Sequence, residues 1–187
     1  MVNQITLLLG GARSGKSALA CSLASQSDNQ PITYIATALA ADQEMAERIR
    51  RHQQDRPAHW RVVEAPLALA EAIEQHNHPD SCLIIDCLTL WLSNLLHGAE
   101  GTPDPLAQIE PQIAAFEQAL INAKGRILIV SNEVGLGIIP LGELTRRFVD
   151  EAGRLNQRLA RLADRVLFVA AGLPLVLKES PEHKCHE

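Results

Sequence analysis

A glycine-rich stretch near the start of the chain has the residue types and spacing of a phosphate-binding loop. Residues 10–17 read GGARSGKS, which matches the pattern G-x-x-x-x-G-K-[ST] in full. Glycines let the backbone wrap closely around an anion with its N–H groups turned inward, and a helix that starts near Lys16 adds its dipole. We expect Lys16 to reach the β- and γ-phosphates of a nucleoside triphosphate and the Ser17 hydroxyl to bind Mg²⁺. The residues expected to contact the nucleotide in this loop are Gly10, Gly11, Ala12, Arg13, Ser14, Gly15, Lys16 and Ser17.

An acidic residue at the end of an apolar run is the candidate second metal ligand. Asp86 follows the run at 83–85, and a phosphate-binding loop needs an acid on a neighbouring strand to hold the metal. Capping of the next helix is a common alternative role for an aspartate. We favour the metal role for Asp86, because an apolar run followed by aspartate recurs at this position in P-loop folds.

A basic helical stretch carries a candidate nucleophile. In EMAERIRRHQQDRP, residues 44–57, the spacing places Met45, Ile49 and His52 on one helical face. Arg48 and Arg56 lie four residues on either side of His52. Cations beside an imidazole hold it neutral, which suits a nucleophile, and arginines bind phosphates bidentately. On spacing alone, a packed core histidine and a solvated basic face remain as alternatives.

A third polar segment, SNEVGLGIIP at 131–140, follows another apolar run. It therefore lies where open α/β sheets place their ligand-contacting loops. Its glycines permit close backbone approach, and Asn132 and Glu133 offer polar contacts. The alternative is a plain loop at the exit of a strand.

Short β-branched runs alternate with helical patterns along the chain. Five runs are nearly continuous in apolar residues, as expected of strands covered on both faces: 5–9, 32–37, 82–86, 126–131 and 166–170. Helical spacing occupies 16–25, 42–54, 67–75, 89–96, 106–123 and 143–163. This alternation predicts an α/β fold, with a mostly parallel sheet flanked by helices. A last run at 174–178 follows after three residues, so we expect an antiparallel edge hairpin near the C-terminus.

Length and composition predict one globular domain. The chain has 187 residues, 47% apolar and 21% charged, and we expect a nucleotide-binding domain at 1–178 and a flexible tail at 179–187. The net charge of −5 argues against nucleic acid as a partner. The N-terminal apolar run is too short for a membrane span, so we expect no stable membrane insertion.

The cysteines favour a reducing compartment. Four cysteines occur without any CxxC pair, which predicts reduced thiols and a cytoplasmic protein. Cys185 and His186 are adjacent in the tail, where no further ligands are apparent, so we expect no metal site there.

Three classes of P-loop protein compete. A GTPase switch needs an [NT]-K-x-D motif, which the chain lacks, and its D-x-x-G match at 150–153 falls inside a helical pattern. A transporter subunit would carry a signature loop and a longer chain. Group transfer to a small molecule remains.

Five blocks of the sequence together resemble one enzyme family. They are GGARSGKS, YIATA with EMAERIRRHQQDRPAHW, LIIDCLTLWLSNLL, SNEVGLGIIP and RRFVDEAGRLNQRLA. The chain is similar, over about 5–178, to the bifunctional adenosylcobinamide kinase/adenosylcobinamide-phosphate guanylyltransferases of cobalamin biosynthesis. The first block is shared by many families, whereas EMAERIRRHQQDRPAHW and SNEVGLGIIP are far more specific.

The resemblance implies two reactions in sequence. The first phosphorylates the hydroxyl of adenosylcobinamide with ATP or GTP, and the second transfers GMP from GTP to the new phosphate and releases pyrophosphate. The family passes GMP through a covalent histidine, and the matching position in R-I-x-x-H-x-x-x-R-P is His52. Lys16 would share the catalytic work.

The resemblance also implies a RecA-like P-loop domain, a homotrimer and a corrinoid partner. Further nucleotide contacts would come from Ala36, Thr37, Ala38, Gln53, Gln54, Asp55, Arg56, Glu64 and Asp86. The apolar stretch LTLWLSNLL at 88–96 suits a subunit interface and a buried helix equally. A P-loop kinase of another small metabolite and a non-catalytic nucleotide-binding module remain as alternatives.

Overall fold

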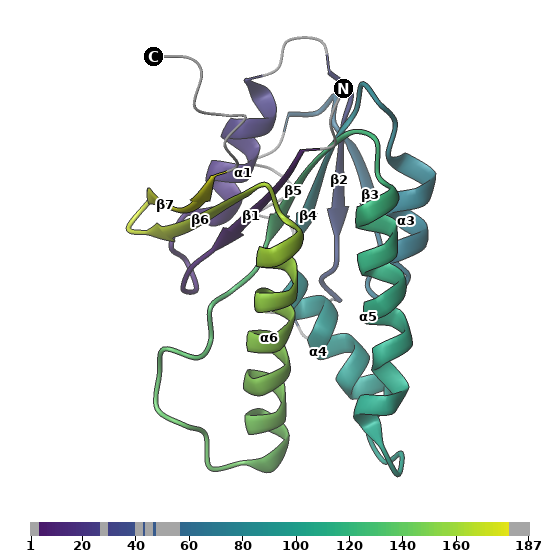
Figure 1. Ribbon diagram of the computed structural model, residues 1–187, viewed down its shortest axis with the longest axis vertical. Coiled ribbons are helices and arrows are strands. Elements are labelled where there is room, and N and C mark those ends of the chain that lie inside the picture. The colour runs from purple at the N-terminus through teal and green to yellow at the C-terminus, as the bar shows by residue number, and fades with distance from the viewer. Residues whose placement is uncertain (1–3, 27–29, 40–42, 44–46, 48–56, 180–187) are drawn as a thin grey trace.

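A computed structural model of the chain describes residues 4–26, 30–39, 43, 47 and 57–179 (Figure 1). The elements in chain order are β1 Ile5–Leu9, α1 Lys16–Ser25, β2 Ile32–Ala36, β3 Arg61–Glu64, α3 Leu69–His76, β4 Cys82–Asp86, α4 Leu88–Gly98, α5 Pro105–Asn122, β5 Arg126–Val130, α6 Glu143–Leu162, β6 Arg165–Ala170 and β7 Leu173–Glu179. Strands and helices alternate through most of the chain, as the periodicity predicts.

The strands form a seven-stranded sheet in the order β3-β2-β4-β5-β1-β6-β7. Neighbouring strands are parallel except β6 and β7, which form the antiparallel hairpin at one edge. The predicted fold class, a mostly parallel α/β sheet with a C-terminal edge hairpin, is therefore confirmed. Strand β5 lies between β1 and β4, so the segments that follow these three strands meet at one edge of the sheet.

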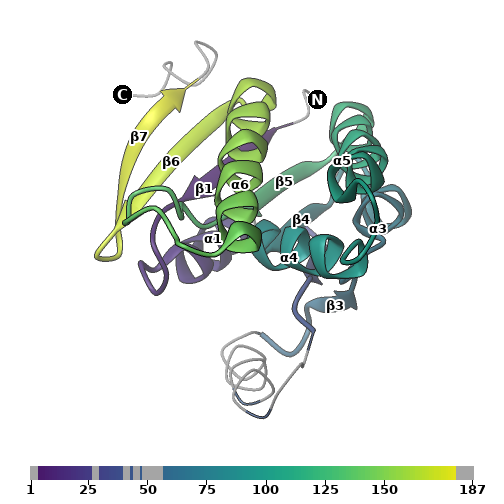
Figure 2. The same cartoon turned by 90° about the horizontal axis from the view of Figure 1, so that it is seen from below.

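Helices cover both faces of the sheet, which explains why its central strands are apolar throughout. One cluster of buried residues joins alternate residues of the strands to α3, α4, α5 and α6, and a smaller cluster joins the residues between them to α1. In β1, Leu7 belongs to the first cluster and Leu8 to the second. Figure 2 shows α1 on the opposite side of the sheet from α5 and α6.

One strand, β3, is not predicted from the sequence. β3 reads RVVE and is mostly exposed, so it lacks the apolar run that marks the other strands. It forms through backbone pairing with β2, in which Thr33 lies opposite Arg61. Edge strands pair on one side only and need no apolar run. Of the predicted helix at 42–54, the structure describes only Gln43 and Glu47, and both are helical.

The apolar stretch at 88–96 is a core helix in this structure. Trp91 and Leu92 of α4 are buried, and the Trp91 indole N–H donates to the carbonyl oxygen of Leu67 at 2.9 Å. The Trp91 ring also packs on Phe116 of α5, with ring centroids 5.1 Å apart. Of the two interpretations of this stretch, a subunit interface and a buried helix, the structure shows the buried helix.

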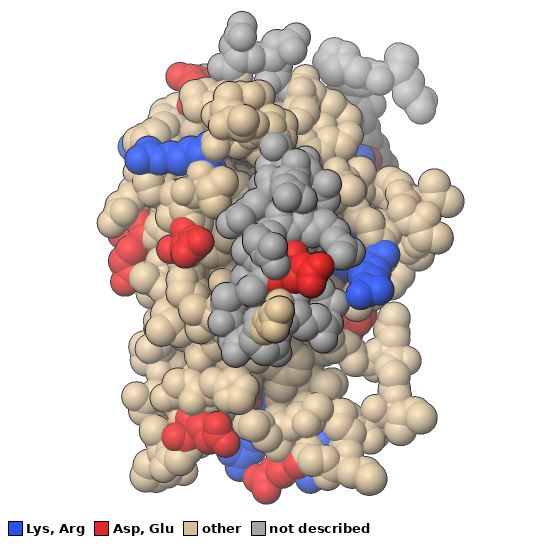
Figure 3. Space-filling view, turned by 180° about the vertical axis from the view of Figure 1, so that it is seen from behind, with Lys and Arg blue, Asp and Glu red and all other residues tan. Residues whose placement is uncertain are grey.

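Side chains of both charges are scattered among the described residues on the face that Figure 3 draws. Among these residues, no helix is long and apolar enough to cross a membrane.

β7 extends to Glu179, and the expected tail beyond it lies outside the described residues.

The Phe116 side chain tests the packing between α4 and α5. It is fully buried, so we expect Phe116→Ala to lower the free energy of unfolding by about 3–5 kcal/mol through lost burial and a residual cavity. Urea unfolding measures this. Ile121 lies on the same helix at 56% exposure, and Ile121→Ala is the control, with an expected change of about 0.5 kcal/mol. Equal midpoints for the two variants would contradict this packing.

Candidate functional site

The turn between β1 and α1 has the backbone shape that a phosphate-binding loop requires. Gly10 and Gly15 have φ of 147° and 100°, a region that side chains disfavour. A Cβ on Gly10 would lie 2.2 Å from the carbonyl oxygen of Val169 in β6, so no other residue fits. Gly11, Ala12 and Arg13 at the tip of the turn are exposed. The loop is therefore packed at its base and open at its tip.

The C-terminal hairpin closes one side of this loop. The Gly172 N–H, in the turn between β6 and β7, donates to the Ser14 carbonyl oxygen at 2.8 Å. A Cβ on Gly15 would lie 3.0 Å from the Gly172 Cα. The sequence analysis does not identify Gly172, because no local pattern links residues so far apart in the chain.

Lys16 begins α1 and is 5% exposed. Its Nζ donates to the Gly11 carbonyl oxygen at 2.6 Å and to the Ser14 hydroxyl at 3.4 Å. Burial lowers the pKa of Lys16, and the nearby groups of Cys87 and Asp86 oppose that shift. The ammonium thus lies inside the loop on oxygens that phosphate oxygens can replace.

Asp86 ends β4 at the same edge of the sheet. Its Oδ2 accepts a hydrogen bond from the Tyr34 hydroxyl at 2.5 Å. The N-cap residue of α4 is Cys87, and its side chain makes no capping hydrogen bond. Asp86 is therefore not the helix cap that the sequence offered as its alternative role. A hydroxyl at Ser17 and a carboxylate at Asp86 are oxygen ligands of the kind that Mg²⁺ prefers.

The residues expected after β2 and β3 lie in one row with Asp86. Ala36 is in register with Glu64 on one side and with Asp86 on the other. Glu64 is exposed, whereas Ala36 and Ala38 are half-buried. The fold therefore brings three expected contact positions, which are far apart in the sequence, to one edge.

Thr37 is fully buried and committed to protein contacts. Its hydroxyl donates to the Cys87 carbonyl oxygen at 2.7 Å and accepts from the Cys87 N–H at 2.8 Å. Its own N–H donates to the Asp86 carbonyl oxygen at 3.1 Å. The Thr37 side chain thus joins the exits of β2 and β4.

Five expected site residues lie outside the described residues: His52, Gln53, Gln54, Asp55 and Arg56. They belong to the connection from β2 to β3, which leaves the carboxyl edge of the sheet after Ala36. The candidate nucleophile therefore stays a prediction.

A buried polar network fixes the segment after β5. The Ser131 hydroxyl donates to Asn156 Oδ1 at 2.7 Å, and Asn156 Nδ2 donates to the Asn132 carbonyl oxygen at 3.2 Å. Asn132 Nδ2 donates to the Thr89 hydroxyl at 2.9 Å. The Glu133 N–H donates to the Gly10 carbonyl oxygen at 3.0 Å. This segment is more than a strand exit, because it joins α4, α6 and the phosphate-binding loop.

Thr89 and Asn156 are the members of this network that the sequence analysis misses. Asn156 falls on the buried side of α6 with Ala152, Leu155 and Leu159. A buried polar residue in the apolar face of a helix usually has a hydrogen-bond partner. The place of Asn156 in that face is therefore the sequence signal for its role in this network.

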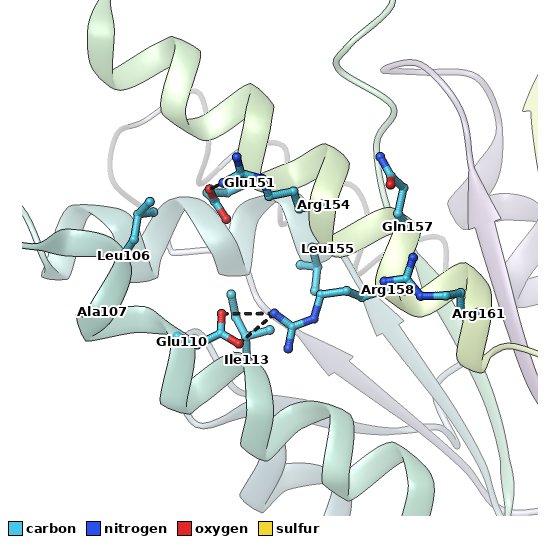
Figure 4. Close-up of a pocket in the computed structure, with 10 residues that line it drawn as sticks. All are labelled: Leu106, Ala107, Glu110, Ile113, Glu151, Arg154, Leu155, Gln157, Arg158 and Arg161. Carbon is cyan, nitrogen blue, oxygen red and sulfur yellow. Dashed lines mark hydrogen bonds and ion pairs between the residues drawn. The ribbon is translucent and has the colours of Figure 1, made fainter.

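A groove of about 520 Å³ lies between α5 and α6, away from the phosphate-binding loop in sequence (Figure 4). Arg158 in its wall donates two 2.6 Å hydrogen bonds to Glu117 and a third, at 2.8 Å, to Glu110. The hydrogen bonds to Glu117 are the main reason that the pKa of Arg158 is raised. None of the predicted site residues that the structure describes lines this groove, and its ion pairs join two helices.

Solved structures share the architecture at low sequence identity. A prototypical ATPase of a bacterial type III secretion system matches with a TM-score of 0.57 and 14% identity, over 96% of this chain and 60% of that one. The flagellar accessory protein FlaH from Methanocaldococcus jannaschii matches with a TM-score of 0.50 and 14% identity, over 95% and 79%. The fold and the loop together define a P-loop nucleotide-binding domain.

The family follows from sequence comparison. The family model described as cobinamide kinase / cobinamide phosphate guanyltransferase matches residues 6–177, and the chain belongs to this family. The bifunctional adenosylcobalamin biosynthesis protein CobP of Pseudomonas aeruginosa is 51% identical, over 94% of this chain and 98% of the relative. CobU of Escherichia coli K12, also described as bifunctional, is 41% identical over 92% and 98%. The family resemblance seen in the sequence is confirmed.

Lys16 provides the test of the phosphate-binding loop. We expect Lys16→Ala to weaken GTP binding and to slow any phosphoryl transfer by about 10²-fold or more, because a positioned cation opposite the phosphates is lost. Calorimetric titration with GTP and a turnover assay measure the two effects. Lys124→Ala, at an exposed lysine, is the control and should match the parent chain. Unchanged binding and turnover in Lys16→Ala would refute the role of the loop.

Proposed function

We propose that this chain phosphorylates adenosylcobinamide with ATP or GTP and then transfers GMP from GTP to adenosylcobinamide phosphate. The products are adenosyl-GDP-cobinamide and pyrophosphate. One observation carries the proposal: a complete phosphate-binding loop with a buried lysine occurs in a chain that matches the kinase/guanyltransferase family over residues 6–177.

In the kinase step, the loop at 10–17 would hold the triphosphate with its inward N–H groups and with Lys16. Ser17 and Asp86 would hold Mg²⁺, which neutralises charge on the β- and γ-phosphates when bound. The Tyr34 hydroxyl fixes one carboxylate oxygen of Asp86 and leaves the other for the metal or its water. These assignments rest on residue types that fit the chemistry.

In the transfer step, the His52 imidazole would attack the α-phosphorus of GTP, and pyrophosphate would leave. The phosphate of the corrinoid would then attack the phosphorus of the histidine adduct and release the imidazole. A covalent intermediate lets one nucleotide site serve two acceptors in turn. The nucleotide contacts proposed around this step are Ala36, Ala38, Gln53, Gln54, Asp55, Arg56 and Glu64, whereas Thr37, which is fully buried, would hold the exits of β2 and β4 in place behind them. The register of Ala36 with Glu64 and Asp86 supports this grouping.

We also propose that the protein works in the reducing environment of the cytoplasm. Cys82 and Cys87 are buried free thiols, and burial raises the pKa of Cys82 to about 11. Such a thiol is unreactive and supports a structural role for the sulfur.

The guanylylated histidine gives the decisive test of this function. We expect [α-³²P]GTP with Mg²⁺ to leave acid-labile, base-stable label on the protein, because a phosphoramidate hydrolyses in acid. His52→Ala should abolish this label, while His97→Ala, at an exposed histidine near the end of α4, should retain it. Gel autoradiography after acid and base treatment measures both.

Two results of this labelling experiment would contradict the proposal. Label that persists in His52→Ala would show that another residue carries GMP. The second result is transfer of γ-phosphate to a small molecule by a parent chain that [α-³²P]GTP never labels. That result would identify a P-loop kinase without guanylyltransferase activity.

We further propose a homotrimer. Strand β7 offers a contact surface, because Leu173, Leu175, Val176 and Leu177 are 46–73% exposed on an edge strand. Long apolar edges are uncommon on surfaces that stay in water. Sedimentation equilibrium should return the mass of three chains. The mass of one chain at micromolar concentration would exclude the trimer.

A further inference from the structure

The two proposed reactions differ in their demand for a base. In the first, the oxygen of an alcohol attacks the γ-phosphorus, and its proton must go to an acceptor. In the second, the attacking groups are a neutral imidazole and a phosphate anion, which have no such proton to lose. Phosphoryl-transfer enzymes that act on alcohols place a carboxylate beside the hydroxyl. The kinase step therefore needs one carboxylate that the guanylyl steps do not.

The strand order tells where such a carboxylate must lie. The phosphate-binding loop follows β1, Asp86 ends β4, and β5 lies between these strands. The residues directly after β5 therefore lie between the loop and Asp86, which are the proposed holders of the phosphates and of the metal. Glu133 is the carboxylate in that segment, and its N–H donates to the Gly10 carbonyl oxygen at 3.0 Å.

Among the residues that the structure describes, two other carboxylates at this edge are less suitable. Asp86 accepts the Tyr34 hydroxyl and is the proposed metal ligand. Glu64 ends β3, which β2 and β4 separate from β5. Glu133 is closer along the sheet to the loop than Glu64 and, unlike Asp86, has no proposed metal to hold.

The Glu133 side chain is held in place by its own turn. Its Oε1 accepts the Gly135 N–H at 2.9 Å, while Oε2 accepts no hydrogen bond from the described part of the chain. A Cβ on residue 135 would lie 3.1 Å from Oε1, so a side chain there would displace the carboxylate by a few tenths of an ångström. Residues 135–139 are all exposed, so a bulky acceptor can approach this side. One carboxylate oxygen is thus fixed and the other is available to a ligand.

We propose that Glu133 is the general base of the kinase step, an inference that rests on the proposed function. Glu133 accepts the proton of the acceptor hydroxyl, and the oxygen forms a bond to the γ-phosphorus. The bond between that phosphorus and the β–γ bridging oxygen breaks, and the nucleoside diphosphate leaves with the bonding electrons. The proton on Glu133 then passes to solvent, which borders the segment.

The variant Glu133→Gln tests this role with little change of shape, because an amide oxygen still accepts the Gly135 N–H. We expect kcat for phosphorylation of adenosylcobinamide by [γ-³²P]GTP to fall by about 10²–10⁴-fold. KM for GTP should stay within about threefold, since the loss is confined to the transition state. Labelling by [α-³²P]GTP should equal that of the parent chain, because it needs no base.

Two further variants separate catalysis from folding. Glu143→Gln makes the same chemical change at an exposed glutamate at the start of α6 and should leave both reactions unchanged. Gly135→Ala displaces the carboxylate by a few tenths of an ångström and should lower the kinase kcat while sparing the α-label.

The outcomes are distinct. A kinase rate of Glu133→Gln within about threefold of the parent rate, or a parallel loss of the α-label, would overturn the role of Glu133 and leave the proposed function standing. A parent chain that neither phosphorylates adenosylcobinamide nor takes up the α-label would overturn the proposed function and this inference with it.

Discussion

The contact between Gly10 and the carbonyl oxygen of Val169 is the constraint on which the candidate site depends. A side chain at position 10 would collide with β6, so the loop can lie against the sheet only because the residue has none. This contact sets where the turn leaves β1, and from there Lys16 enters the loop at the start of α1. It also leaves the Gly10 carbonyl oxygen in reach of the Glu133 N–H. The absence of a side chain at Gly10 thus allows β6, β1 and the segment after β5 to lie close together.

Local patterns in the sequence predict most of this fold. Strands β1 and β4 and helix α1 have the predicted bounds, because buried parallel strands are apolar throughout and the glycines of the loop mark where α1 begins. β3 escapes prediction, since backbone pairing at an edge requires no apolar run. Within the site, a single spaced motif identifies Lys16 and Ser17, whereas Thr89 and Asn156 join Asn132 only through tertiary packing.

The candidate site has a rigid side and a solvent-facing side. On the rigid side, Thr37, Cys87 and the asparagine network tie together the exits of β2, β4 and β5 through buried hydrogen bonds. On the other side, the tip of the loop and residues 135–139 are exposed. Such a division suits group transfer, because the donor must be held in one orientation while acceptors of large size come and go. The ion pairs of Arg158 brace α5 and α6 behind this arrangement.

The bond from Gly172 to Ser14 joins the beginning and the end of the chain. During synthesis, residues 10–17 leave the ribosome long before the hairpin that supports them, so a nascent chain carries the motif without its supporting turn. The support of the loop is complete only when β6 has paired with β1 and the β6–β7 turn has reached Ser14. Chains truncated before Gly172 therefore lack this support for the loop.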